Sequence, residues 1–194
     1  MKVLVACEYS GVVRDAFIAA GHEAMSCDLL PTDKPGPHYQ GDVRDVLDYP
    51  WDLMVAHPPC TDIAVSGARH FEAKRLDGRQ QSAVSFIKRL AKADIPRIAI
   101  ENPVGILSSL WRKPDQIIQP YEYGHPESKS TCLWLKNLPV LKPTDILTIP
   151  AKGYWDNQTP SGQNKLGPSE DRWKIRSATY TGIAKAMADQ WGAL

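Results

Sequence analysis

Residues 52–60, Asp-Leu-Met-Val-Ala-His-Pro-Pro-Cys, join a short apolar run to two consecutive prolines and a cysteine. The run is continuous rather than alternating, which is typical of a strand buried on both faces of a parallel sheet. Pro58 and Pro59 each fix a φ angle and lack an N–H donor, so the strand must end before Cys60. We therefore expect Cys60 in a stiff loop at the carboxyl end of a parallel strand, where open α/β sheets bind ligands.

Apolar runs and amphipathic segments alternate on both sides of this strand. Apolar runs predict further strands at 2–7, 23–27 and 97–100. Helical spacing of apolar residues predicts helices at 12–20, 79–93 and 180–191. Residues 31–40 are rich in proline and polar side chains and predict a loop. The alternation indicates an α/β fold, with a doubly wound and mostly parallel sheet.

The pattern changes after residue 103. Short β-type runs at 131–135 and 146–149, with no long helix between them, predict an antiparallel hairpin at the edge of the sheet. Residues 150–173 are polar and glycine-rich and predict a long loop. We expect one domain over 1–194, divided into a cofactor and nucleophile half (1–103), an edge hairpin and polar loop region (104–176) and a closing helix (177–194).

The net charge is only +1, but it is unevenly distributed. Residues 1–60 hold four Lys and Arg against nine Asp and Glu, whereas 69–97 holds eight basic residues against three acidic ones. An acidic half suits a ligand with hydroxyl groups or a positive centre, and a basic segment suits phosphates. Solvated helix faces would give the same charge pattern, so charge alone leaves both interpretations open.

The four cysteines are far apart and include no Cys-x-x-Cys, which argues against a zinc site or a disulfide framework. We expect them to be reduced, as in a cytoplasmic protein. No signal peptide opens the sequence and no apolar stretch approaches the length of a membrane span, so we expect neither export nor a membrane partner.

A second group of polar residues, Glu101-Asn102-Pro103, follows the apolar run at 97–100. Parallel strands end at one edge of a sheet, so we expect Glu101 and Cys60 to lie close together. A positioned thiol is a nucleophile and a carboxyl group is a general acid, a combination that favours chemistry on a pyrimidine ring. His57 either assists Cys60 or is a structural histidine.

At this point the sequence resembles the cytosine-C5 DNA methyltransferase superfamily, and most of all a small, phage-type branch of it. The motif order is kept over nearly the whole chain. The segments that carry the resemblance are Glu8-Tyr9-Ser10-Gly11, Asp28, Gly41-Asp42-Val43, Pro58-Pro59-Cys60, Glu101-Asn102, 123–129 (Tyr-Gly-His-Pro-Glu-Ser-Lys) and 182–186 (Gly-Ile-Ala-Lys-Ala). The resemblance implies a Rossmann-like methyltransferase fold and S-adenosyl-L-methionine as cofactor. The implied cofactor-binding residues are Glu8, Tyr9, Ser10, Gly11, Asp28, Leu29, Asp42, Val43 and Pro58.

Three departures from the family pattern stand out. Val12 and Val13 occupy positions where a further glycine is usual. Lys129 and Thr131 stand where arginines are usual, and lysine cannot make a planar bidentate contact. Only about 40 residues separate the predicted hairpin from the last helix, so a full target-recognition domain is lacking.

The resemblance implies catalytic roles for Cys60, Glu101, Asn102 and Lys129. The Cys60 thiolate would add to C6 of cytosine, so that C5 can attack a methyl sulfonium. Glu101 would hydrogen-bond to the ring at N3 or protonate it there, and for donation we expect burial to raise its pKa. Asn102 would brace the nucleophile loop and Lys129 would lie near the ring carbonyl. We expect the Cys60 thiol to be activated, because an ordinary thiol is mostly protonated at neutral pH.

The implied function is methyl transfer to C5 of cytosine in duplex or single-stranded DNA, in a bacterial host cytoplasm if the protein is phage-encoded. Two alternatives stay open: the same chemistry on RNA or a free cytidine nucleotide, and a catalytically silent protein that binds cofactor and nucleic acid. Trp155 and Trp173 could equally serve packing. The candidate nucleic-acid contacts are Arg69, Lys74, Arg75, Arg79, Trp155 and Trp173.

Overall fold

The centre of the computed structural model, which describes residues 1–194, is a seven-stranded sheet in the order β3-β2-β1-β4-β5-β7-β6. All neighbouring strands are parallel except β7, which runs antiparallel to both β5 and β6. The strands are β1 Lys2–Ala6, β2 Glu23–Asp28, β3 His38–Gln40, β4 Leu53–Ala56, β5 Arg97–Pro103, β6 Gln116–Ile118 and β7 Thr131–Lys136. The α-helices are α1 Val12–Ala19, α2 Phe71–Leu76, α3 Arg79–Ala91, α4 Leu107–Leu110, α5 Arg172–Ser177 and α6 Thr181–Trp191, and 3₁₀ turns span Val43–Asp45, Val65–His70 and Pro120–Glu122.

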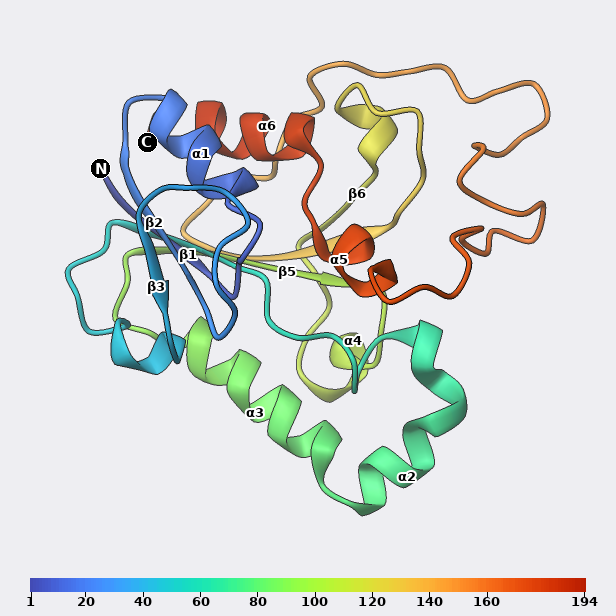
Figure 1. The fold of residues 1–194 in the computed structure, drawn as a ribbon, viewed down its shortest axis with the longest axis horizontal. Coiled ribbons are helices and arrows are strands. Elements are labelled where there is room, and N and C mark those ends of the chain that lie inside the picture. Colours follow the sequence, from blue (N-terminus) through green and yellow to red (C-terminus); the bar gives the residue numbers. More distant parts are fainter.

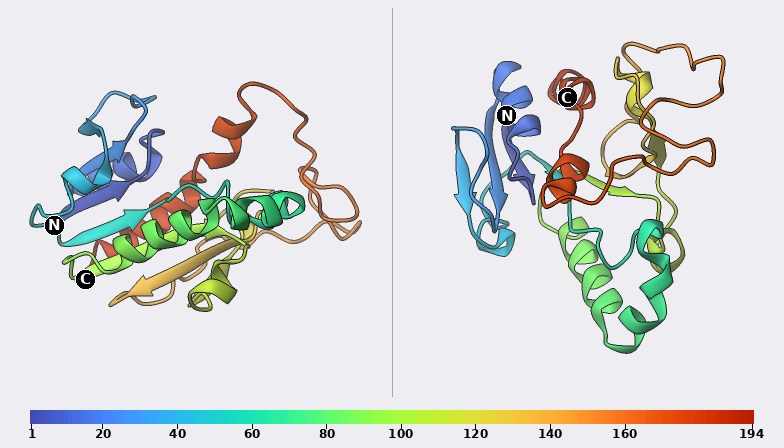
Figure 2. Two further views of the ribbon diagram at one scale, coloured as in Figure 1. Left: turned by 90° about the horizontal axis from the view of Figure 1, so that it is seen from below. Right: turned by 45° about the vertical axis from the view of Figure 1, so that its right-hand side comes forward.

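Helices cover both faces of the sheet, which is why the central strands are apolar throughout. In β1, Val3 and Val5 face the core beneath α1 and α6, whereas Leu4 and Ala6 face the core beside α3. Figure 1 shows α1 and α6 side by side on one face and α3 on the other, and the right-hand view of Figure 2 separates the same layers. The predicted doubly wound, mostly parallel α/β sheet is confirmed.

The predicted edge hairpin exists, but the partner assigned to it from the sequence is wrong. The strand at 131–135 pairs with β6, which precedes it, and not with 146–149. Ile146 and Ile149 are exposed and lie in no strand. A strand of three residues gives too short a pattern to be recognised in a sequence, and β6 at the edge is only partly apolar.

Two other boundaries differ from the sequence prediction. The segment expected as a loop at 31–40 ends in the short strand β3, which pairs with the end of β2. Strand β5 continues through Glu101 and Asn102 to Pro103, because β7 pairs alongside it up to Thr131. Glu101 and Asn102 therefore lie on a strand that is paired with β7 at their positions, a more rigid support than a loop.

The sheet reverses its strand order between β1 and β4, which are neighbours in space although β2 and β3 lie between them in the sequence. In an open α/β sheet, ligands bind outside the carboxyl ends of the strands at such a point. The loop after β1 carries Glu8–Gly11, and the loop after β4 carries Pro58–Cys60. None of the helices is long and apolar enough to cross a membrane.

Candidate active site

The nucleophile loop begins directly after β4 and is held by hydrogen bonds at both ends. Nδ2 of the buried Asn102 donates to the carbonyl oxygen of Pro58 at 2.8 Å. The amides of Ile63 and Ala64 donate to the carbonyl oxygen of Cys60, at 3.1 and 2.9 Å, and close a tight turn. Cys60 itself is partly exposed. Its thiol is therefore held in a fixed place without being sealed in the core.

The segment after β5 braces the same loop from the other side. Val65 donates its amide to the carbonyl oxygen of Val104, and Ile106 donates to that of Ile63, both at 3.0 Å. Between these bonds Ala64 and Gly105 form an isolated antiparallel bridge. The two backbones approach so closely that a Cβ on Gly105 would lie 2.2 Å from the Ile63 carbonyl oxygen.

Glu101 lies beside His57 because β4 and β5 are paired in parallel register, with Ala56 opposite Ile100. Oε2 of Glu101 is 3.0 Å from Nδ1 of His57, and both side chains are largely buried. Burial opposes ionisation of Glu101, but the hydrogen bond and charge of His57 and the charge of Lys129 outweigh it and hold the pKa of Glu101 below its usual value. The expectation of a raised pKa for Glu101 is wrong for this conformation.

The pKa of the Cys60 thiol is shifted in the direction opposite to activation. Burial raises it, the neighbouring Glu101 carboxylate raises it further, and the cations of Lys129 and Arg176 lower it only in part. The expected activation is therefore wrong for the protein without substrate or cofactor. Any thiolate that forms at neutral pH needs a change in these surroundings, such as the approach of a cation or of a hydrogen-bond donor.

Lys129, just before β7, lies near both reacting groups, since its charge acts on Glu101 and on Cys60. Its ammonium donates to the carbonyl oxygen of Arg176 at 2.8 Å and lies 5.7 Å from the ring centroid of Tyr180. Thr131 is buried and donates its hydroxyl to the carbonyl oxygen of Lys129 at 3.2 Å. Lys129 is thus the cation that the segment before β7 contributes to this edge of the sheet.

The loop between β1 and α1 is organised around the buried carboxylate of Glu8. Oε1 accepts from the amide of Val13 at 2.7 Å and from the hydroxyl of Ser10 at 3.1 Å, and Oε2 accepts from the amide of Arg14 at 3.2 Å. Gly11 begins the helix with a left-handed backbone, φ +71°. A carboxylate therefore occupies the N-terminus of α1, where a dinucleotide-binding fold would place a phosphate.

Asp28 and Asp42, the two acidic residues implied in cofactor binding, differ in their hydrogen bonds. Oδ1 of Asp28 accepts from the amide of Leu30 at 2.9 Å, and its other oxygen forms no hydrogen bond within the protein. Both oxygens of Asp42 are bound by the Arg44 side chain, and the hydrogen bonds from Arg44 lower the pKa of Asp42 to about 2. Leu29 is 72 % exposed beside Asp28.

The short helix α5 joins the cofactor loop to the catalytic edge. The hydroxyl of Tyr9 lies 2.9 Å from that of Ser177 and donates to the carbonyl oxygen of Lys174 at 3.2 Å. The ring of Trp173 packs on Tyr9 with centroids 5.5 Å apart and stays half exposed. Neither this helix nor the charge of Arg176 at Cys60 was predicted from the sequence, because six mostly polar residues after a long loop carry no periodic signal.

The basic segment after Cys60 divides into residues that are paired and residues that are free. Lys74 is buried, donates to the carbonyl oxygen of Thr61 and lies 3.3 Å from Asp62. The prediction that Lys74 contacts phosphate is wrong in this conformation, since its ammonium fastens α2 to the nucleophile loop. Arg79 is exposed but pairs with Asp77. Arg75 and Arg69 are exposed, although Arg69 is hydrogen bonded to the neighbouring His70.

Trp155 is a packing residue and not an accessible base contact. It is 7 % exposed and stacks on Tyr121, with centroids 5.8 Å apart and an angle of 24° between the rings. Of the two tryptophans whose role the sequence left open, only Trp173 presents its ring to solvent.

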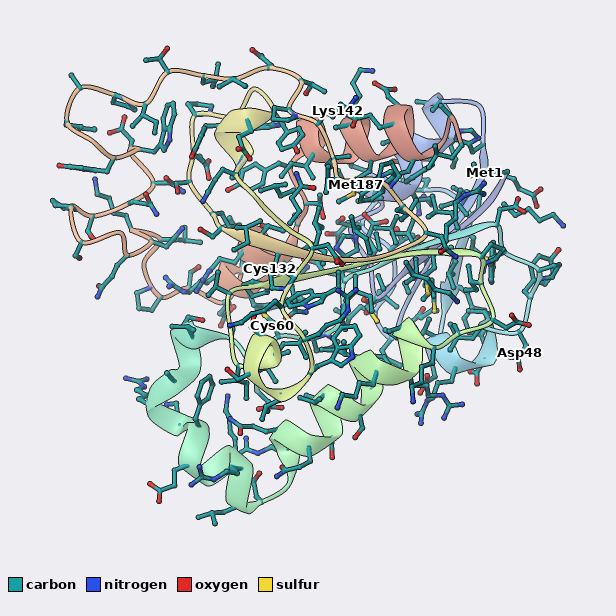
Figure 3. All side chains as sticks on the ribbon, turned by 180° about the vertical axis from the view of Figure 1, so that it is seen from behind. Met1, Asp48, Cys60, Cys132, Lys142 and Met187 are labelled. Atoms are coloured by element: carbon teal, nitrogen blue, oxygen red, sulfur yellow. The ribbon has the colours of Figure 1, made fainter.

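Figure 3 shows Cys60 on the α4 side of the sheet, well away from Asp48 at the other end.

Comparison with known proteins finds solved structures that are similar in fold. No protein-family model and no curated protein matches the sequence. Among the solved structures that do match is a candidate DNA modification methyltransferase encoded within a prophage of E. coli, with a TM-score of 0.50 and 18 % sequence identity. The alignment covers 76 % of this chain and 52 % of that one, so the chain spans about half the length of its structural neighbour. The fold is a Rossmann-like methyltransferase fold.

Proposed function

We propose that this protein transfers a methyl group from S-adenosyl-L-methionine to C5 of cytosine in DNA, through a covalent bond between Cys60 and C6. The observation that carries the proposal is the meeting of Cys60, Glu101 and Asn102 at the carboxyl ends of β4 and β5. The fold supports it, because a solved structure that shares this fold is a candidate DNA modification methyltransferase.

In the proposed reaction the thiolate of Cys60 adds to C6, and the ring nitrogen at position 3 takes a proton by way of Glu101. The ring then has the reactivity of an enamine, and C5 becomes a nucleophile. Lys129 stabilises negative charge on the ring oxygen, and Asn102 keeps the loop in place through Pro58. After transfer, a water molecule accepts the C5 proton and the C6–S electron pair returns to sulfur, which releases 5-methylcytosine.

The residues after β1 and β2 suit the proposed cofactor. The free oxygen of Asp28 can accept from a ribose hydroxyl, and the loop 8–11 borders the point where the strand order reverses. Because the Glu8 carboxylate occupies the N-terminus of α1, the site suits a phosphate-free ligand with a positive centre better than a dinucleotide. When bound, the cofactor supplies an electrophilic methyl group on a sulfonium.

The DNA contact that we propose uses the exposed residues beside the nucleophile loop. A cytosine in a duplex must leave the base stack, at a cost of a few kcal/mol, to reach Cys60. Arg69 and Arg75 are exposed and would meet phosphates, and the half-exposed ring of Trp173 would stack on a base. Because the segment between β7 and α5 is short for a recognition domain inserted there, we expect a weak or very short sequence preference.

A covalent trap tests this proposal directly. DNA that contains 5-fluorocytosine cannot lose the C5 substituent, so the enzyme stays attached after methyl transfer. We expect a cofactor-dependent adduct with the wild-type protein and none with Cys60→Ser. The control Cys27→Ser should form the adduct, since a serine hydroxyl can keep the contact that Cys27 makes with the Gly41 carbonyl oxygen. Adducts on RNA or on a nucleotide, with none on DNA, would show that the substrate is RNA or a nucleotide and not DNA.

One observation favours a second candidate, a silent protein that binds cofactor and nucleic acid. The pKa of Cys60 is raised and that of Glu101 is lowered, so both groups have the protonation state opposite to the one that the reaction needs. Tight binding of S-adenosyl-L-methionine without transfer to DNA, RNA or nucleotides, and without an adduct, would support this candidate.

A further inference from the structure

We propose that His57 is a positioning residue for Glu101, and that the two side chains together carry the proton which the target base takes up at its ring nitrogen. This inference rests on the proposed function, because it requires a substrate whose ring gains and later loses a proton.

The backbone fixes the two side chains beside each other. Ala56 and Ile100 are opposite each other in neighbouring parallel strands, so the next residues, His57 and Glu101, project on the same face of the sheet. The amide of His57 donates to the carbonyl oxygen of Ala6 at 2.8 Å, which continues the ladder between β1 and β4 past the end of the strand. The resulting contact between Nδ1 and Oε2 is 3.0 Å.

The pair has unused hydrogen-bonding capacity. Nε2 of His57 is buried and has no hydrogen-bond partner. Oε1 of Glu101 forms no hydrogen bond within the protein, although Oε2 is bound to His57. A buried polar atom without a partner is unfavourable and is rare in folded proteins. Nε2 of His57 is such an atom, and its place beside the nucleophile loop is explained if a bound substrate completes the pair.

The charged and titratable groups around the pair come from three other elements. Lys129, before β7, acts on Glu101, and the Glu101 carboxylate acts in turn on the thiols of Cys60 and Cys132. Arg176, from α5, adds a cation near Cys60. With a lowered pKa, Glu101 has no proton of its own to donate near neutral pH. The proton for the ring must therefore come from a partner, and His57 is the group in direct contact.

The proton transfers balance as follows. Before addition, imidazolium and carboxylate share one mobile proton at Nδ1. As the thiolate forms its bond to C6, that proton passes to the carboxylate and from there to the ring nitrogen. The ring gains one proton, His57 becomes neutral and Glu101 ends as a carboxylate. When the C6–S bond breaks, the electron pair returns to sulfur and the proton returns to His57 by the same route.

Single-turnover methyl transfer to DNA across pH 5.5–8.5 tests the inference, with wild type, His57→Asn and His57→Ala. Asparagine can keep the hydrogen bond to Oε2 but cannot carry the proton. Because the pKa of Cys60 is raised, the thiolate fraction grows with pH, so we expect the wild-type rate to rise with pH and to level off above the apparent pKa of the pair. His57→Asn should lose that levelling-off and react about 10²-fold more slowly, with an unchanged KM for DNA. His57→Ala should be slower still, because it also loses the orientation of Glu101.

The control is His22→Asn. His22 directly precedes β2 and so lies at the amino ends of the parallel strands, whereas His57 follows the carboxyl end of β4. This variant should keep the wild-type rate and pH profile. A wild-type pH profile in His57→Asn would overturn the inference. If the wild-type protein transfers no methyl group at all, the proposed function fails, and ¹³C titration of Glu101 then decides whether the pair exists. A higher pKa of Glu101 in His57→Ala supports the pair, and an unchanged value overturns it.

Discussion

Replacing Gly105 with alanine should destabilise the protein and misalign its nucleophile at the same time. The added Cβ would lie 2.2 Å from the carbonyl oxygen of Ile63 and 3.1 Å from Cα of Ala64. These are backbone atoms of the nucleophile loop, so no side-chain rotation can relieve the overlap. The loop must move away from β5, and the hydrogen bonds that flank the Ala64–Gly105 bridge must lengthen.

The size of the effect follows from the cost of overpacking, which is about 1–3 kcal/mol for an added methyl group in a packed region. With a urea m-value of about 2 kcal/mol/M, a loss of about 2 kcal/mol lowers the unfolding midpoint by about 1 M. A displacement of about 1 Å at Cys60 should also slow formation of the covalent adduct by about 10²-fold.

Urea unfolding followed by tryptophan fluorescence measures the loss in free energy of unfolding. The rate of adduct formation with 5-fluorocytosine DNA measures how far the displacement of Cys60 slows the reaction. Gly167→Ala is the matched control, because no atom lies within 4 Å of its added Cβ, and it should change stability by less than about 0.5 kcal/mol. If Gly105→Ala unfolds at the wild-type midpoint and reacts at the wild-type rate, the close approach of the two backbones is not what holds the loop.

Three further predictions concern residues whose contacts differ from the sequence expectation or explain local structure. Lys74→Met should lose about 1–2 kcal/mol of stability, because it loses the hydrogen bond to the carbonyl oxygen of Thr61. It should leave the salt dependence of DNA binding unchanged, because the ammonium is engaged within the protein, and a shallower salt slope would contradict this. Glu8→Ala should cost about 1–2 kcal/mol by leaving the first amides of α1 without an acceptor, seen in calorimetry as a Tm lower by about 2–8 °C; an unchanged Tm would argue against this cap. Arg44→Ala should raise the pKa of Asp42 from about 2 towards the ordinary value near 3.9 in a ¹³C NMR titration. Because its pKa is depressed in the folded protein, Asp42 stabilises the wild type above about pH 4 and loses that contribution as pH falls towards 2, a loss that the variant should not show.

The sequence predicted the central strands and long helices because their signals are local. The apolar run at 53–56 and the helical spacing at 79–91 each contain enough residues to specify the element and its buried face. The partner of the strand at 131–135 could not be predicted in the same way. Its pairing with Gln116–Ile118 depends on contacts across the sheet and on a strand of three residues.

In the candidate site, too, the features with a local sequence signal were predicted, and those that depend on contacts in the folded chain were not. Cys60 and Glu101 were predicted at one edge because both follow apolar runs of a parallel sheet, and they lie there in the structure. The burial of Lys74 and the engagement of Asp42 by Arg44 depend on side-chain contacts, and a charged residue has the same appearance in a sequence whether it is paired or free. The protonation directions of Cys60 and Glu101 likewise follow from neighbours that only the fold brings together.

The packing of α6 against α1 has a consequence for how the protein acquires its structure. Ile183, Met187 and Trp191 fill the core beneath β1 and α1, although about 160 residues separate these two parts of the chain. During synthesis at about 5–20 residues per second, the apolar side of α1 therefore waits for many seconds without its partner. A nascent chain stalled before α6 should bind chaperones and be cut by proteases within α1, whereas one that has released α6 should resist both.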